Sequence, residues 1–360
     1  MENGVAQKVN SQKGGVKILV IILVILVIVA GVLLAMRIWQ DSQNTQTTGN
    51  AGEENIQNQE VEDPQPKTFA GNSRPIAFMI DNNINAMPQA GLEQADLVYE
   101  IIVEGGETRL MALMKDKELD RIGPLRSARH YFLDYALEND AIYVHYGQSP
   151  QAKSDITTLG IADINGIYES GSYFWRDSSR YAPHNAVTSS EQIQKIIERE
   201  DYRTTTNKGT VLNYVVDEVE LEGEDNEAYE VTIPYSAYNT VRYEYNEETK
   251  TYTRYSRDEE QLDWNTNKSI QVKNIIITKC ENSSDGSSTG RQVIDNIGKL
   301  DGYYITNGKY IPITCEKTER SEKTVYKDLE GNEIEVNDGK TFIQICPIDS
   351  DIEFEGASEE

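Results

Sequence analysis

The stretch LVYEIIVEGGETRLMALM, residues 97–114, predicts the centre of the fold. Two apolar runs flank a Gly-Gly pair, a strong signal for a β-hairpin with a two-residue loop. Such a loop pairs Ile102 with Arg109 and, because side chains alternate along a strand, places Glu100, Glu104 and Arg109 on one face of the sheet. We expect either a structural ion pair there or a general acid whose pKa is raised by its apolar surroundings.

Strand and helix signals alternate on both sides of this hairpin. Short apolar runs predict further strands at 76–80 and 141–146, and helical patterns cover 124–138 and 190–200. Strand signals dominate later, at 241–245, 251–255, 274–278, 303–306 and 341–346. We therefore expect an α/β fold of the α+β kind, with layered mixed sheets and helices. Its parts would be an N-terminal lobe (68–215), a β-rich C-terminal lobe (216–348) and an acidic tail (349–360).

The segment IGPLRSARHYFLD, residues 122–134, carries candidate binding residues. Pro124 suits the first turn of a helix, whose free backbone amides favour an anion. Arg126, Ser127 and Arg129 would add two guanidinium groups and a hydroxyl, a set that suits a carboxylate or phosphate. The same arginines could instead pair with an internal partner such as Glu100 or Glu104, and the sequence leaves this choice open.

Histidines and cysteines give no metal or redox motif. The three histidines lie within one window of the chain, but without an H-x-H or H-x-x-x-H pair. We expect His145, on a strand, and His184, in a loop before Asn185, to act through hydrogen bonds. The three cysteines form no C-x-x-C pair, and we expect thiols in the core rather than a disulfide. No cofactor is expected.

An apolar segment near the N-terminus predicts a membrane anchor. Residues 18–36 contain no charge, and as a helix they would span roughly 28 Å, about the thickness of a bilayer core. Lysines in residues 1–17 predict a cytoplasmic N-terminus and an extracytoplasmic bulk of the chain. Residues 37–67 are rich in Gln, Asn, Thr and Glu, and we expect a disordered stalk. The formal net charge of −26 argues against nucleic acid as a partner.

Several motifs, taken together and in this order, resemble the YerB-like family of bacterial envelope proteins, a domain of unknown function. They include RPIAFMIDNN, GLEQADLVYEIIVEGGETRLMAL, IGPLRSARHYFLD, HYGQSP, RYAPHNAVT, KNIIITK, DGYYITNGK and EIEVNDGKTFIQICP. The resemblance covers nearly all of 74–347 and implies an exported two-part α/β protein without fixing an activity. Carried across, the family pattern marks Asp81, Tyr99, Glu100, Glu104, Gly105, Gly106, Arg109, Arg126, Ser127, Arg129, His145, His184 and Asn185.

Two departures from the family pattern concern the anchor and Cys315. Many relatives resemble lipoproteins, whereas this chain carries a transmembrane segment. Cys315 stands where the pattern has tryptophan, which puts an aromatic role at that position in doubt.

Three functions are compatible with these features. The first is a membrane-tethered protein that binds an anionic or sugar-containing envelope ligand in a cleft between the lobes, through Asp81, Arg109, Arg126, Ser127, Arg129, His145, His184 and Asn185. The second is a glycan-cleaving enzyme with Glu100 or Glu104 as its acid. Four residues apart on one strand, these carboxyls are separated by roughly 13 Å, which suits a glycosidase pair poorly. The third is a scaffold or regulator of an envelope complex.

Overall fold

The computed structural model describes residues 65–223 and 226–357. The predicted cytoplasmic segment, the predicted membrane span 18–36 and nearly all of the predicted stalk lie outside these ranges. Within them, no helix is both long enough and apolar enough to cross a membrane. The described ranges belong to one compact unit, Asp63–Glu360.

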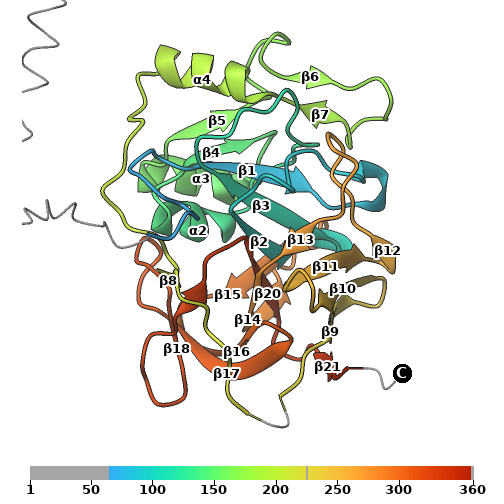
Figure 1. The fold of residues 1–360 in the computed structure, drawn as a ribbon. Coiled ribbons are helices and arrows are strands. Elements are labelled where there is room, and N and C mark those ends of the chain that lie inside the picture. The colour runs from blue at the N-terminus through green and yellow to red at the C-terminus, as the bar shows by residue number, and fades with distance from the viewer. Residues whose placement is uncertain (1–64, 224–225, 358–360) are drawn as a thin grey trace, which may run out of the picture. The chain divides into compact units, whose positions relative to one another are not determined.

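A large mixed sheet of eleven strands runs through both halves of the sequence (Figure 1). Its strands, in spatial order, are β18 (Val325–Lys327), β17 (Lys309–Lys317), β16 (Gly298–Thr306), β14 (Asn274–Ser284), β20 (Thr341–Pro347), β2 (Leu97–Ile102), β3 (Thr108–Met114), β1 (Ile76–Asp81), β4 (Ile142–His145) and β5 (Asp163–Asn165), with β15 (Gln292–Asp295) paired to β14. Strand β20 pairs in parallel with both β2 and β14. The backbone ladder therefore joins the N-terminal and C-terminal halves directly.

A second sheet of six strands comes from the C-terminal half. It contains β12 (Glu259–Glu260), β11 (Thr251–Ser256), β10 (Asn239–Asn246), β9 (Glu230–Ser236), β21 (Glu353–Glu355) and β13 (Gln271–Val272). Two short pairs complete the strands, β8 (Tyr214–Val215) with β19 (Val336–Asn337) and β6 (Trp175–Arg176) with β7 (Ala186–Val187). The acidic tail thus contributes β21, an edge strand of the second sheet.

Few helices accompany these sheets. They are α2 (Phe132–Glu138), α3 (Pro150–Leu159) and α4 (Ser190–Arg199), with the 3₁₀ turns η1 (Ile84–Ala86) and η2 (Glu104–Gly106). The expectation of layered mixed sheets with helices is therefore confirmed in its coarse form.

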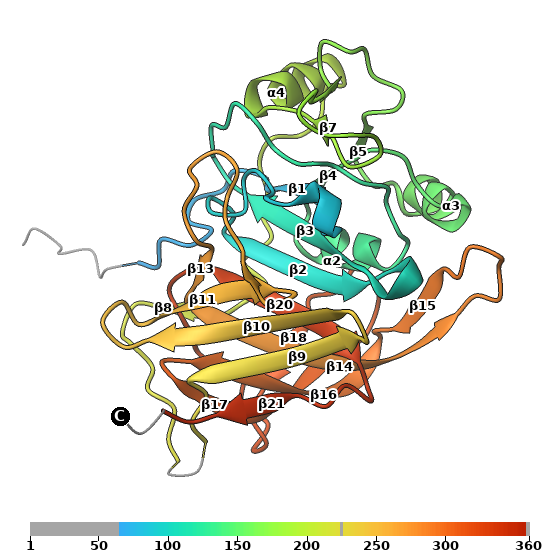
Figure 2. The ribbon, with the colours of Figure 1, turned by 90° about the vertical axis from the view of Figure 1, so that its right-hand side faces the viewer.

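The two faces of β2 meet different layers. The ring of Tyr99 lies 4.7 Å from that of Tyr135, centroid to centroid, so this face packs against α2. The adjacent Glu100 points to the other face, where its carboxylate meets Arg254 of β11. Figure 2 shows the second sheet, with β9 and β10, lying over that face of the large sheet.

The predicted register of the central hairpin is wrong by one residue. Ile101, not Ile102, lies opposite Arg109, and Ile102 lies opposite Thr108. The connection is longer than two residues, because β2 ends at Ile102, β3 begins at Thr108 and the turn η2 lies between them. Since side chains alternate, a shift of one residue moves a side chain to the opposite face. Glu100 and Arg109 therefore lie on opposite faces and do not form the predicted cluster.

The predicted helix over 124–138 is also partly wrong, because only Phe132–Glu138 is helical. Its first part is extended and forms backbone hydrogen bonds with the end of β1. The Asp81 amide donates to the Pro124 carbonyl at 2.8 Å, and the Arg126 amide donates to the Met79 carbonyl at 2.8 Å. Pairing with neighbouring strands outweighs the local helix propensity, and no helix N-terminus lies beside Arg126.

The three cysteines are free and buried, as expected from their spacing. Burial raises the pKa of the Cys315 thiol to about 12. Burial also raises the pKa of the Cys346 thiol to about 12. Both groups therefore remain thiols at neutral pH and pack as small apolar residues.

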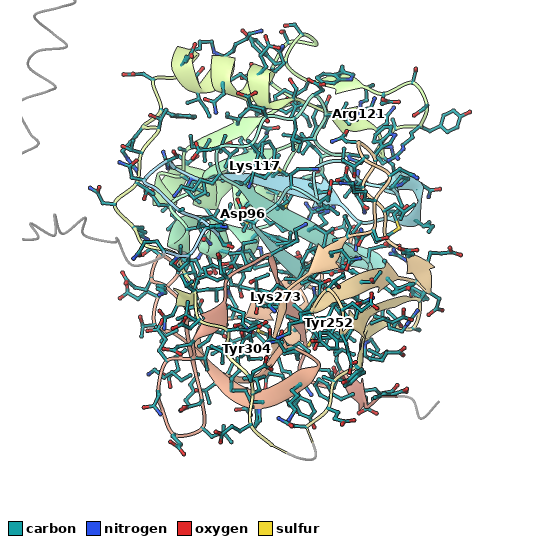
Figure 3. All side chains as sticks on the ribbon, viewed as in Figure 1. Asp96, Lys117, Arg121, Tyr252, Lys273 and Tyr304 are labelled. Carbon is teal, nitrogen blue, oxygen red and sulfur yellow. The ribbon has the colours of Figure 1, made fainter. Side chains whose placement is uncertain are left out.

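Buried tyrosines fill the C-terminal half, where Tyr252 and Tyr304 are labelled in Figure 3. Each hydroxyl has a partner. Tyr252 Oη accepts from the Gly308 amide at 3.0 Å, and Tyr304 Oη donates to Asn274 Oδ1 at 3.1 Å. The rings thus pack in the core without leaving a polar atom unsatisfied.

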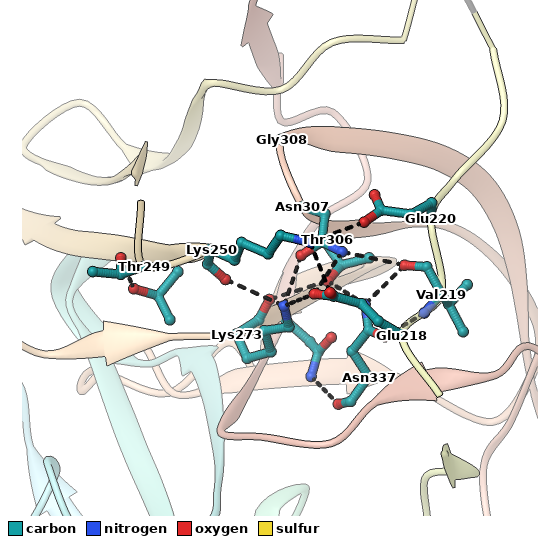
Figure 4. Close-up of polar contacts among 12 residues, drawn as sticks. Glu218, Val219, Glu220, Thr249, Lys250, Lys273, Thr306, Asn307, Gly308 and Asn337 are labelled. Carbon is teal, nitrogen blue, oxygen red and sulfur yellow. Dashed lines mark hydrogen bonds and ion pairs between the residues drawn. The ribbon is translucent and has the colours of Figure 1, made fainter. Parts of the chain in front are cut away.

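The carboxylate of Glu218 holds in place the segment of the chain that leads into the C-terminal half. Glu218 accepts from Lys250 Nζ and Lys273 Nζ, both at 2.7 Å, and from Asn307 Nδ2 at 3.1 Å (Figure 4). These donors come from three separate segments of the C-terminal half. The Lys250 and Lys273 hydrogen bonds hold the pKa of Glu218 at about 2.

We predict that Glu218→Gln destabilises the protein at neutral pH and not at strongly acidic pH. The lowered pKa contributes stability above the unfolded value of about 4.5, and this contribution is lost as pH falls from about 4.5 to about 2. Because the side chain is 38% exposed, we expect only about 1 kcal/mol at pH 7. Urea unfolding at pH 7 and at pH 2 measures the difference. Glu220→Gln, which removes one contact of Lys250 at 3.2 Å, is the matched control.

Candidate functional site

A cavity of about 340 Å³ lies where β1 and β2 end and β3 begins. Parallel strands end at the same edge of a sheet, the edge at which ligands often bind in α/β folds. The lining residues are Asp81, Asn83, Val103, Glu104, Glu107, Thr108, Arg109, Arg126, Arg129, His184, Thr289 and Arg291. They come from both halves of the described chain.

Asp81 anchors one side of the cavity from the last position of β1. Its side chain is only 4% exposed, and its Oδ2 lies 2.7 Å from His184 Nδ1 and 3.2 Å from Arg126 Nε. The Arg126 contact is an ion pair without hydrogen-bond geometry. Within residues 65–223 and 226–357, the Nη groups of Arg126 make no hydrogen bond, so they can still donate to a ligand.

Glu104 and Arg129 form a closed bidentate pair on the other side. Arg129 Nε and Nη2 donate to the two carboxylate oxygens of Glu104 at 2.7 and 2.9 Å. Burial alone would raise the pKa of Glu104, but the hydrogen bonds and charge of Arg129 outweigh burial and lower it. Glu104 is therefore ionised at neutral pH and holds no proton to donate as a general acid.

Arg109 forms the floor of the cavity and is almost completely buried. Its Nη1 donates to the Ser127 carbonyl, while its Nη2 lies 3.9 Å from Glu104 Oε2, beyond hydrogen-bond range. Burial, together with the charges of Arg129 and Arg126, lowers the pKa of Arg109 to about 10. Even so, the guanidinium is charged at neutral pH and has donors to spare.

The sequence predictions missed several lining residues, above all Arg291. It lies in the hairpin between β14 and β15, which Figure 2 shows extending toward the end of β2. Arg291 is tied only loosely, with Nη1 3.8 Å from Asp285 Oδ2. Glu107 was missed although it lies within the opening hairpin, and it is bound by Arg257, in the turn between β11 and β12. No local motif marks Arg291, because its proximity depends on the register of β14.

Four predicted site residues lie outside the cavity lining. His145 is buried, with Nδ1 2.8 Å from the Gly147 carbonyl and Nε2 3.1 Å from Asp163 Oδ2. Ser127 places its carbonyl against Arg109 and Arg129, and its hydroxyl donates to the Tyr146 carbonyl.

The other two are Asn185 and Glu100. Asn185 organises the loop that carries His184, since its Nδ2 donates to the Asp177 and Arg180 carbonyls at 3.0 Å.

Glu100 lies behind the cavity in a closed polar network. Its Oε2 accepts from Arg254 Nη2 at 2.6 Å, and both side chains have no exposed surface. Its Oε1 accepts from Thr108 Oγ1 at 2.7 Å and from Asn82 Nδ2 at 3.0 Å. Burial alone would lower the pKa of Arg254, but the charge of Glu100 raises it. A carboxylate so enclosed has no access to a substrate.

The charge of the cavity is opposite in sign to that of the chain. Four arginines and one histidine line it, against three carboxylates that are each held by an arginine or a histidine. In the part of the chain that the structure describes, no three His, Cys, Asp or Glu side chains are grouped to hold a metal ion. The arrangement suits an anion better than a cation.

The comparisons with known proteins agree on one family. Residues 63–203 match the family model "Protein of unknown function (DUF3048) N-terminal domain", and residues 231–343 match the corresponding C-terminal domain. The chain is 32% identical over 286 residues to "Putative lipoprotein YerB" of Bacillus subtilis (strain 168), covering 76% of this chain and 81% of that protein.

A crystal structure of the YerB protein from Bacillus subtilis is similar with a TM-score of 0.70 and 31% identity, covering 78% of this chain and 94% of that one. The chain therefore belongs to the YerB-like DUF3048 family, as its motifs predict.

We predict that Glu100→Gln is strongly destabilising, because it leaves the buried Arg254 charge without its counter-ion. The expected loss is about 3–5 kcal/mol in the free energy of unfolding, measured by urea denaturation. Glu191→Gln, which breaks an exposed ion pair with Lys195, should cost less than about 0.5 kcal/mol.

A double variant separates the lost counter-ion from a general packing defect. Glu100→Gln combined with Arg254→Met keeps an acceptor for Thr108 and Asn82 and removes the stranded charge. It should be more stable than Glu100→Gln alone. Equal stability of the two variants would contradict the buried ion pair as the cause.

Proposed function

We propose that this member of the DUF3048 family is an envelope-associated protein that binds an anionic ligand in the arginine-lined cavity. One observation carries the proposal: guanidinium groups outnumber carboxylates in a cavity of about 340 Å³, within a chain whose formal net charge is −26. Like charges that are held together and partly buried raise the energy of the empty site, and a bound anion would relieve that repulsion.

Three arginines have the donors that such a ligand needs. Arg126, Arg109 and Arg291 make few hydrogen bonds to the described part of the protein, as their contacts above show. Arg129 differs, because its guanidinium already donates to Glu104 and to the Ala128 carbonyl. We therefore assign ligand contact to the first three residues and a supporting role to Arg129, with His184 holding Asp81 in place.

A location outside the cytoplasm, tethered to the membrane, is part of the proposal. It is supported by the name of the Bacillus subtilis relative, "Putative lipoprotein YerB", and by the apolar segment 18–36 with its lysine-rich flank. The ligand would then be a component of the envelope that carries carboxylate or phosphate groups, with or without sugar. The strongly acidic surface of the chain argues against nucleic acid.

Glycan cleavage by Glu100 or Glu104 has less support. A retaining or inverting mechanism needs one protonated and one ionised carboxyl on either side of the scissile bond. Glu100 is enclosed with Arg254, and the pKa of Glu104 is lowered rather than raised. No specific contact favours a scaffold role over ligand binding.

We predict that Arg126→Gln and Arg291→Gln each weaken phosphate binding by about ten- to a hundredfold. This factor corresponds to one lost charge-assisted hydrogen bond of about 1.5–3 kcal/mol. Isothermal titration of the full-length protein with inorganic phosphate measures it. Fold should be retained, because Asp81 keeps His184 as a partner and Arg291 is only partly buried.

The control for these variants is Arg199→Gln, at an arginine that pairs with Glu169 and Glu200 away from the cavity lining. It should bind phosphate like the wild type. Wild-type affinity in both Arg126→Gln and Arg291→Gln would refute an anion site in this cavity.

A further inference from the structure

A second, smaller cavity adjoins the arginine-lined one. It has a volume of about 180 Å³ and shares Arg129 and Arg291 with its neighbour. Its other lining residues are His130, Ser149, Pro150, Gln151, Asp285 and Gln292. Because Arg129 and Arg291 line both spaces, the two cavities lie next to each other on either side of these guanidinium groups.

The size of the first cavity argues against a small ion as its natural occupant. A volume of about 340 Å³ falls within the range of roughly 300–1,000 Å³ typical of pockets for whole organic ligands. A single phosphate or carboxylate would contact only some of the available donors. Arg126 and Arg291 do not share a carboxylate, and they come from opposite halves of the chain, so one small anion would leave part of this charge unused.

The second cavity also favours negative charge. Arg129 and Arg291 contribute two guanidinium groups, against the single carboxylate of Asp285. Arg129 offers mainly its charge to this space, because most of its donors are used by Glu104 and nearby carbonyls. Arg291 has its donors largely free and lies at the boundary, where it can bind groups on either side.

We propose that the ligand is a linear molecule with at least two anionic groups, which lies across both cavities and over Arg291. The first group would be held by Arg126 and Arg109, and the second would lie beside Gln151. This inference rests on the proposed function, because it requires the first cavity to bind an anion. It adds that the ligand is an extended polyanion, with repeated phosphate or carboxylate groups.

Gln151 offers a clean test, because it lines only the second cavity and is exposed at the start of α3. A carboxylate in the first turn of a helix is favourable for the fold, so Gln151→Glu should not destabilise the protein. It would nevertheless repel a second anionic group. Gln151→Lys introduces the opposite charge at the same place and should attract that group.

The experiment compares inorganic phosphate with inorganic tripolyphosphate and with tricarballylate, by isothermal titration of the full-length protein. We expect at least one of the two polyanions to bind the wild type more tightly than phosphate does. Gln151→Glu should lower the affinity for that polyanion by about tenfold, and Gln151→Lys should raise it. The affinity for phosphate should change by less than about twofold in both variants. The polyanion that responds identifies the group as phosphate or carboxylate.

Gln192→Glu is the matched control, since it makes the same change in the first turn of α4. It should leave all affinities unchanged. Two results would contradict the proposal of an extended ligand. In the first, neither polyanion binds more tightly than phosphate; in the second, the two Gln151 variants change the affinities for phosphate and for the polyanion by the same factor. If the wild type bound neither phosphate nor either polyanion, the proposed function itself would be refuted, so the two failures are distinguishable.

Discussion

The buried ion pair between Glu100 and Arg254 joins the two layers of the fold. Both side chains are fully enclosed, and the charges come from different sheets, so neither can be satisfied unless the sheets are packed together. Such a pair adds little net stability over an apolar packing, but its geometry penalises any other arrangement of the sheets. One Nη group of Arg254 and the side-chain oxygens of Asn239 and Gln261 have no partner among the described residues, so this interface is polar as well as buried.

The same strands that bury this pair also present the open cavity. On β3, Thr108 donates to Glu100 while the next residue, Arg109, forms the cavity floor. Near the end of β1, Asp81 meets Arg126 and His184, while Asn82 donates to Glu100. Adjacent residues at these strand ends thus serve a buried polar network and an open, positively charged cavity, and Thr108 takes part in both.

Local patterns predicted which segments form strands far better than how those strands are aligned. Apolar runs located β1, β2, β3, β4 and β20, and a helical pattern over 190–200 located α4, because these features depend on neighbouring residues. The hairpin register did not follow from the Gly-Gly pair, since both glycines lie inside a longer turn, in which the Gly106 carbonyl accepts from Ser236 Oγ of β9.

Residues 122–129 show the same limit at the site. Their helical pattern is overruled by backbone pairing with β1, and that pairing brings Arg126 to Asp81. Arg291 comes from a hairpin far along the chain, and only the parallel pairing of β14 with β20 and of β20 with β2 carries it to the cavity. A cation whose position depends on the register of distant strands cannot be recognised as a site residue from the residues next to it in the sequence. Arg109 differs from Arg291 in this respect, because its guanidinium is buried and donates to the Ser127 carbonyl in the folded protein, so an anion would meet this donor already in place.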